Sequence, residues 1–303
     1  LQRYFPVPLQ KKYSAEMEKL RLKREIIATA VTNSTINRMG ATFLLRMQED
    51  TGRSPAEVAK AFTITRETLD ARALWTQIDA LDGKVPESVQ VDALQVIWTL
   101  QRSFTRWLLG RPGAIPDIAT AVARYHDGYN EIRAADGVLP DSLRPAYNAS
   151  LTDWKQKGLP DALAGQLAAL PYLDRSCDII EVARTHKLKP VEVSKVHFRL
   201  GEALHLPWLF DQVDALQVDG RWHAVARGVL RDELATHQRT LTSEVLRMPG
   251  ATAEAKVKHW IGRDDPALRF TLSMLNELAA QKTLDYPTAS VAVQRLSQLA
   301  SKA

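Results

Sequence analysis

The chain of 303 residues is 45% hydrophobic and 25% charged, which is the ordinary composition of a folded protein and excludes a disordered one. No apolar run approaches the roughly 20 residues of a membrane-spanning helix, and we expect no signal peptide at the start of the chain. The sole cysteine, Cys177, allows no intrachain disulfide, so we expect a reducing, cytoplasmic location.

The amino-terminal segment carries the net positive charge. Residues 1–60 contain 11 Lys/Arg and 6 Asp/Glu, a difference equal to the formal net charge of +5 of the whole chain. The chain begins with Leu1 rather than Met, so we expect a piece of a longer polypeptide in which residues 1–40 form a linking segment and helix. Such a basic segment can bind nucleic acid. A solvated linker or a contact with an acidic neighbouring domain is the more usual reason.

The clearest helix start lies at Ser54. Its hydroxyl can accept a hydrogen bond from the backbone N–H three residues on, Pro55 fits the first helical position, and Glu57 can complete a capping box. A second helix is predicted to follow through residues 74–81.

A longer helix comes next. Its apolar residues, from Val89 to Leu108, are spaced three and four apart, which predicts one buried helix face. Pro86 stands at its start, and the sequence Gly-Arg-Pro-Gly at residues 110–113 ends it. No segment alternates as a strand would, so the sequence predicts an all-α fold.

The same sequence pattern recurs later in the chain. Residues 55–60 read PAEVAK and residues 190–195 read PVEVSK, at an offset of 135. At that offset and without a gap, Trp75 falls on Phe210. Identities at buried and exposed positions alike indicate a duplication, and we expect the two aromatic rings to fill equivalent core sites.

The end of the third helix repeats as well, with the offset increased to 137. The Pro-Gly stop at 111–113 corresponds to 248–250, so the intervening loop should contain two inserted residues. The sequence therefore predicts a multi-helical bundle built from two tandem, similar helical units, residues 41–170 and 176–303, packed as one domain. Lys189 replaces the capping serine in the second unit, which should weaken that helix start by about 1 kcal/mol.

The motifs of cofactor chemistry are missing from the sequence. None of the 14 glycines forms the Gly-x-Gly-x-x-Gly turn of a dinucleotide site, and no phosphate-binding loop is present. No two of the seven histidines are four residues apart, as a zinc-binding helix would require. We therefore predict no catalytic, cofactor-binding or metal-binding residues in this chain, and a buried, inert thiol at Cys177.

Two further patterns have alternative interpretations. Trp75, Trp98 and Trp107 could stack on a ligand, but their helical spacing favours packing in the core. The two short helices after Ser54 could form a DNA-binding helix-turn-helix, but the turn lacks its usual glycine and Arg66 is one of few basic residues there.

Residues 20–40, which read LRLKREIIATAVTNSTINRMG, resemble the segment that follows the catalytic domain in the large bacterial NAD-specific glutamate dehydrogenases. The sequence RYFP at residues 3–6 and the helical pair at 54–82 are similar to that family too. The resemblance is sharpest over residues 1–113.

The resemblance implies a very long homo-oligomeric polypeptide with regulatory domains, then a catalytic domain, then this helical region. The implied parent reaction converts L-glutamate to 2-oxoglutarate and ammonia, with NAD as hydride acceptor. The family's catalytic lysine and aspartate and its dinucleotide-binding glycines belong to the preceding domain, and no position of this chain matches them. The implied partners are that catalytic domain and further copies of the enzyme.

Asn33, Asn37 and Arg38 are the candidate functional residues within the matching segment. If residues 16–39 form one helix, the two asparagines lie four apart on one face with Arg38 beside them. These polar side chains could dock the region on the catalytic domain, or they could cap and cross-link helices inside this domain.

The leading hypothesis is a non-catalytic structural and oligomerisation module of a glutamate dehydrogenase. A free-standing helical repeat that binds nucleic acid or protein is the alternative. An independent enzyme using carboxylates such as Asp136 and Asp141 is a third possibility, disfavoured because both lie in a loop without a paired base.

Overall fold

The computed structural model describes residues 1, 4–135, 137–281 and 283–301, and in these residues the regular structure is helical, without a strand. The predicted all-α class is confirmed. The chain forms two compact units, Leu1–Arg124 and Tyr125–Ala303. This boundary lies inside a helix, whereas the repeat pattern suggests a division between residues 170 and 176.

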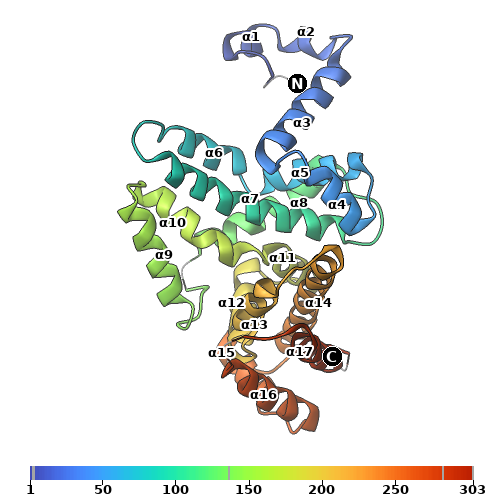
Figure 1. The fold of residues 1–303 in the computed structure, drawn as a ribbon, viewed down its shortest axis with the longest axis vertical. Helices are drawn as coiled ribbons and strands as arrows, with labels where there is room; N and C mark the ends of the chain where they lie inside the picture. Colours follow the sequence, from blue (N-terminus) through green and yellow to red (C-terminus); the bar gives the residue numbers. More distant parts are fainter. Residues whose placement is uncertain (2–3, 136, 282, 302–303) are drawn as a thin grey trace. The chain divides into compact units, whose positions relative to one another are not determined.

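The helices of the first unit are drawn in blue and blue-green in Figure 1. They are α1 (Val7–Lys12), α2 (Ser14–Glu18), α3 (Lys23–Met39), α4 (Phe43–Thr51), α5 (Pro55–Thr68), α6 (Ala71–Asp79) and α7 (Glu87–Leu109). The unit boundary falls within α8 (Ile118–Ala134).

The helices of the second unit follow in green to red (Figure 1). They are α9 (Arg144–Gln156), α10 (Asp161–Ala169), the 3-10 helix η2 (Leu170–Leu173), α11 (Ser176–His186), α12 (Pro190–Ala203), α13 (Leu206–Ala215), α14 (Arg221–Leu246), α15 (Ala253–Ile261), α16 (Pro266–Ala279) and α17 (Tyr286–Ala300). Asp136, one of the two loop carboxylates considered above, lies outside the described residues.

The first unit begins with an arm of three helices, α1 to α3. The single helix expected over residues 16–39 is divided, because α2 ends at Glu18 and α3 begins at Lys23. Short-range backbone bonds, such as the one from the N–H of Leu20 to the carbonyl of Met17, form a turn between the two helices. Neither proline nor glycine marks this break in the sequence.

The core of the first unit forms where α5 packs against α7, with α4 and α6 beside them. The predicted capping box starts α5: Ser54 Oγ accepts from the N–H of Glu57 at 3.3 Å, and Glu57 Oε2 accepts from the N–H of Ser54 at 3.0 Å. Phe62 on α5 is fully buried and meets Phe43 edge to face, with ring centroids 6.2 Å apart. The helix therefore starts through local chemistry and is held by its apolar face.

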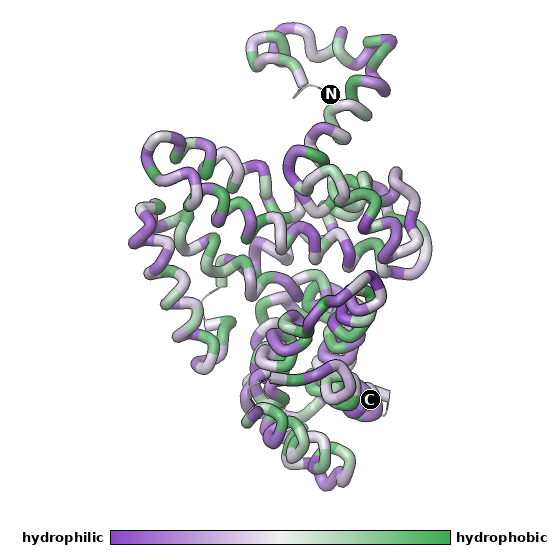
Figure 2. Tube along the Cα trace, viewed as in Figure 1, coloured by the Kyte–Doolittle hydropathy of each residue, from purple (hydrophilic) through white to green (hydrophobic). Residues whose placement is uncertain are grey.

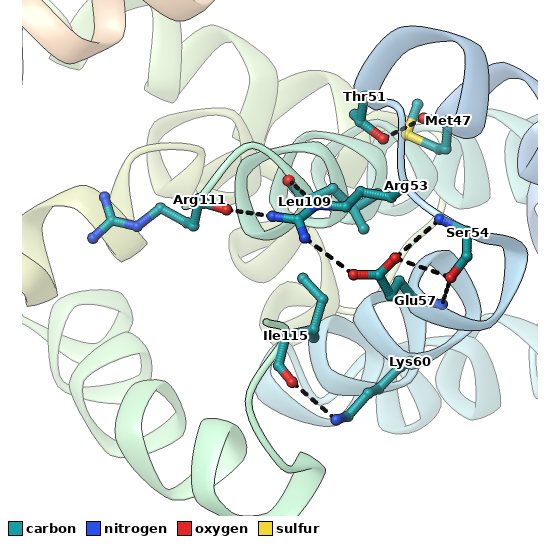
Figure 3. Close-up of polar contacts among 9 residues, drawn as sticks. All are labelled: Met47, Thr51, Arg53, Ser54, Glu57, Lys60, Leu109, Arg111 and Ile115. Carbon is teal, nitrogen blue, oxygen red and sulfur yellow. Dashed lines mark hydrogen bonds and ion pairs between the residues drawn. The ribbon is translucent and has the colours of Figure 1, made fainter. Parts of the chain in front are cut away.

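Arg53, which precedes the α5 cap Ser54, bonds the carboxyl end of α7, and Lys60 on α5 bonds the loop that follows (Figure 3). Arg53 donates to the carbonyl oxygens of Leu109 and Arg111, and it also pairs with Glu57 at 3.0 Å. Lys60 donates to the carbonyl of Ile115 at 2.9 Å. Cations at a helix carboxyl end satisfy free carbonyl groups and favour the helix dipole.

The second unit contains the same set of helix pairs. As α4, α5, α6 and α7 pack in the first unit, so α11, α12, α13 and α14 pack in the second. Helices α5 and α12 each have 14 residues, and they start at Pro55 and Pro190. Helix α7 ends at Leu109 and α14 ends at Leu246, at the increased offset of 137.

Unusual backbone angles recur at the expected offset. Asp70 before α6 and His205 before α13 both adopt the left-handed conformation, with φ of 50° and 51°. Gly52 after α4 and Lys187 after α11 do the same, with φ of 69° and 55°. Non-glycine residues rarely adopt this conformation, so its repetition at Asp70 and His205 supports a duplication; the pair Gly52 and Lys187 is weaker support, because glycine adopts it readily.

A buried glutamine also recurs. Gln101 on α7 donates to the carbonyl oxygen of Phe62 at 3.5 Å, and Gln238 on α14 donates to that of His197 at 3.2 Å. Phe62 and His197 are 135 residues apart, whereas Gln101 and Gln238 are 137 apart. The two additional residues of the second unit therefore lie between His197 and Gln238. Satisfying the same buried carbonyl by the same means also supports a duplication.

The aromatic pair is less alike than the sequence suggests. Trp75 is 5% exposed in the core of the first unit, whereas Phe210 is partly exposed at the surface of the second. Trp98 and Trp107 are also only partly buried, so of the three tryptophans considered above only Trp75 is a full core residue. At the start of α12, Lys189 makes no side-chain capping hydrogen bond, but its N–H donates to Glu192 Oε2 at 3.3 Å, so half of the capping box is kept.

Candidate functional site

Helix α3 carries the candidate residues, and it is attached to the first unit along one side only. It contacts α4, α5 and α7, and of its 17 residues only Thr35 is buried. Thr35 donates to the carbonyl of Val31 at 2.8 Å, and Ser34 accepts from Arg66 on α5 at 3.1 Å. Most of the surface of α3 therefore faces away from the unit's core.

Arg66 holds this attachment in place, and sequence reasoning missed its role. Its side chain is only 6% exposed, and it pairs with Glu67 at 2.8 Å, while Arg72 also bonds Glu67 at 3.1 Å. Burial alone would raise the pKa of Glu67, but the hydrogen bond from Arg72 and the charges of both arginines outweigh it and hold the pKa below its usual value. Arg66 is thus a buried structural cation, which removes one basic group from the helix-turn-helix interpretation.

Arg38 points toward the first unit. Its guanidinium lies over the ring of Trp75, 4.6 Å from the centroid, and its Nη2 is 3.8 Å from Asp79 Oδ2. The side chain is 28% exposed. A cation held on an aromatic face and beside a carboxylate contributes to packing within the unit.

Asn33 and Asn37 lie on the opposite side of α3. With about 100° between successive helical residues, both lie roughly 160° from Thr35 around the helix. Both side chains are exposed, and neither has a hydrogen-bond partner among the described residues. The structure therefore separates the three candidates, with Arg38 facing inward and the two asparagines facing outward.

Apolar side chains accompany the two asparagines along the arm. Leu22, at the start of α3, is 64% exposed, and Ile36 is 39% exposed. Further exposed apolar residues of the arm are Tyr4, Val7, Leu9, Tyr13, Leu20 and Ile27. Figure 2 shows hydrophobic and hydrophilic positions mixed along these helices. Such a concentration of exposed apolar side chains is typical of a surface that contacts another protein.

The arm is also positively charged. Lys11, Lys19, Arg21 and Arg24 are exposed, and none has an ion-pair partner among the described residues, whereas Lys23 pairs with Glu18. Lys19 and Arg21 flank the exposed Leu20 in the turn before α3, whereas Arg24 lies only about 20° from Thr35 around the helix and so belongs to its inward side. The arm therefore presents a mixed basic and apolar surface.

Chemistry-bearing groups elsewhere are scattered. In the described part of the chain, no group of three or more His, Cys, Asp and Glu residues could hold a metal ion. Cys177 is buried on α11, as predicted. None of the described helices is both long and apolar enough to cross a bilayer.

Fold and surface together define an all-α helical domain with an exposed basic and apolar arm. The chain belongs to the family described as "Glutamate dehydrogenase, C-terminal", whose model matches residues 1–298. The resemblance seen at residues 20–40 is thereby confirmed for nearly the whole chain.

Two relatives illustrate the match. A protein named NAD-specific glutamate dehydrogenase from Halomonas elongata is 32% identical over 308 residues, which cover 99% of this chain and 19% of that protein. A protein of the same name from Pseudomonas aeruginosa is 33% identical over 299 residues, which cover 98% of this chain and 18% of that protein. This chain spans about a fifth of the length of these relatives.

Proposed function

We propose that this chain is the non-catalytic C-terminal structural and oligomerisation module of an NAD-specific glutamate dehydrogenase. The proposal rests on the match of residues 1–298 to the C-terminal family and on the small share of each relative's length that this chain covers. The parent would convert L-glutamate, NAD and water to 2-oxoglutarate, ammonia and NADH in the cytoplasm. Its cofactor site would lie outside these 303 residues, since their sequence lacks the glycine turn that dinucleotides require.

We also infer that the module arose by duplication of a four-helix unit, α4–α7 and α11–α14. The repeated left-handed residues and the two buried glutamines support this interpretation. Tandem helical units stack into larger bodies that offer extended surfaces to other proteins. A duplicated scaffold of this kind fits a role in assembly, which requires surface rather than reactive groups.

The test compares the full-length enzyme with a version that lacks residues 1–303. We expect the truncated enzyme to keep its affinity for NAD in calorimetry but to lose its native assembly in light scattering. The 303-residue chain by itself should not bind NAD. Micromolar NAD binding by this chain, or an unchanged assembly of the truncated enzyme, would contradict the proposal.

A nucleic-acid-binding helical repeat is the alternative function, because four exposed cations of the arm lack carboxylate partners among the described residues. Such binding would weaken steeply with salt, because each phosphate contact releases counterions. A titration of duplex DNA and single-stranded RNA at low and physiological salt distinguishes the two functions. Tight binding at physiological salt would favour the alternative.

A further inference from the structure

We infer that the outward face of α3 is the surface by which this module attaches to the rest of its own polypeptide, at a partner site that combines an apolar patch with carboxylates. The inference rests on the proposed function and identifies the contact surface. It assigns Asn33 and Asn37 to the interface and leaves Arg38 outside it.

The first support is the spacing of residues on α3. Leu22, Ile26, Thr29, Asn33 and Asn37 follow one another at intervals of four, three, four and four, which places them on one side of a helix. This side lies opposite Thr35, the only buried residue of the helix. The stripe is therefore an outer face, on which Leu22, Thr29, Asn33 and Asn37 are exposed and Ile26 is partly exposed.

The second support is the cost of leaving such a face in water. A helix of 17 residues with one buried side chain gains little stability from the contacts that it makes in this chain. Its sequence nevertheless places leucine and isoleucine on the exposed side, where a solvated helix would carry charged residues. The pattern is that of an interface helix whose partner lies outside these 303 residues.

The charge of the arm favours one kind of partner. Residues 1–40 contain 8 Lys/Arg and 3 Asp/Glu, so a second copy of the arm would present the same excess of positive charge to the exposed Lys19 and Arg21. A surface with carboxylates would instead pair with these cations. The arm therefore fits a different, acidic surface better than it fits itself.

The two asparagines favour protein over lipid. Each amide both donates and accepts hydrogen bonds, which suits the backbone and side chains of a protein surface. Insertion of this face into hydrocarbon would leave both amides without partners, at a cost of several kcal/mol by general transfer scales. The relatives supply the protein partner, since about four-fifths of their length lies outside the matched region.

The test uses cysteine labelling in the full-length enzyme. Asn33→Cys and Asn37→Cys report on the outward face, and Thr32→Cys is the matched control, because Thr32 is exposed on the same helix but turned by about 100° from its neighbour Asn33. The rate of maleimide labelling is followed by mass spectrometry of the peptide that carries each cysteine. We expect the two outward cysteines to react about tenfold more slowly than the control, because thiol reactivity depends on access.

Charge reversal tests the acidic character of the partner. Lys19→Glu with Arg21→Glu, in the turn before α3, should abolish the protection of Asn33→Cys. Lys84→Glu with Arg102→Glu changes two exposed cations elsewhere in the first unit by the same charge, and it should leave the protection intact. Equal effects of the two double variants would overturn the acidic partner.

Other occupants give different results. Protection that appears only as protein concentration rises would identify a second copy, and protection that requires added nucleic acid or anionic vesicles would identify those ligands. Each of these results overturns the inference, and so does equal labelling at all three positions. If labelling is equal while removal of residues 1–303 still destroys the assembly, the proposed function holds and only the contact surface is wrong.

Discussion

His197 on α12 gives the second unit a specific sensitivity to acid. It is fully buried, and burial, with the nearby charge of Arg175, lowers its pKa from 6.5 to about 3. Its Nδ1 lies 3.0 Å from Thr242 Oγ1, and that hydroxyl donates to the carbonyl of Gln238 at 2.7 Å. The hydroxyl oxygen therefore accepts from Nδ1–H. Protonation would add a second donor at Nε2, which is buried and has no hydrogen-bond partner among the described residues.

The sign and size of the effect follow from linkage. The pKa of His197 is lower in the folded chain than in the unfolded chain, so the unfolded chain alone binds a proton at this side chain between about pH 6.5 and pH 3. The stability that depends on the neutral histidine is therefore fully present above about pH 6.5 and is lost as the pH falls below it. Between pH 7 and pH 5 the loss from this one group is about 2 kcal/mol. The result is nearly the same for any folded pKa below about 4, because the folded histidine then stays neutral throughout this range.

The proposed duplication suggests the variant for the assay. Phe62 stands at the corresponding position of the first unit and is fully buried there, so His197→Phe should fold. Urea unfolding followed by circular dichroism at pH 7 and pH 5 should show a pH-dependent loss smaller by about 2 kcal/mol in this variant than in the parent. His223→Gln, which changes a half-exposed histidine, is the control. Identical losses in parent and His197→Phe would refute the assignment.

Three further predictions concern packing and capping. Trp75→Ala should cost about 3–5 kcal/mol in urea unfolding, whereas Phe210→Ala should cost about 1–2, because its ring is partly exposed; equal costs would contradict the observed difference in burial. Ser54→Ala should cost about 1 kcal/mol through loss of the α5 cap, and an unchanged urea midpoint would argue against the capping box. Gly128→Ala should lower the melting temperature, because its Cβ would lie 2.9 Å from an isoleucine side chain. In Gly165→Ala the Cβ would meet only the Tyr147 hydroxyl, at 4.0 Å, and helix propensity should raise the melting temperature; the reverse order would contradict this difference in packing.

Local chemistry made much of the fold predictable. The start of α5 depends on three neighbouring residues, Ser54, Pro55 and Glu57, whose roles can be read without knowledge of the tertiary structure. The extent of α7 follows from its apolar spacing together with Pro86 and Gly110. The equivalent start of α12 is predictable because residues 190–195 are similar to residues 55–60, and similar sequences share start signals.

The remaining features depend on contacts between distant residues. The break between α2 and α3 has no proline or glycine to announce it. Arg66 reads in sequence as a surface cation, and only its placement against Ser34 and Glu67 makes it a buried one. The outward orientation of Asn33 was likewise beyond sequence reasoning, because periodicity shows that two residues share a face but does not show which face is covered.

Comparison of the two units explains why Arg38 belongs to the scaffold and not to the interface. In the second unit Arg175 lies over Phe210, 4.5 Å from the ring centroid, much as Arg38 lies over Trp75 at 4.6 Å. Phe210 occupies the position of Trp75 in the repeat, so an arginine on an aromatic face occurs at the same place in both units.

Carboxylates complete the comparison. Asp79 lies near Arg38 in the first unit, and at the corresponding position of the second unit Asp214 pairs with Arg231 at 2.6 Å. Arg231 also pairs with Asp174 and lies 5.4 Å from the ring centroid of Phe210, so two arginines of the second unit contact this ring. A contact that both units use for internal packing needs no external partner to explain it. Asn33 and Asn37 make no such internal contact among the described residues, and this difference leaves the outward face of α3 as the part of the matching segment that is free to bind.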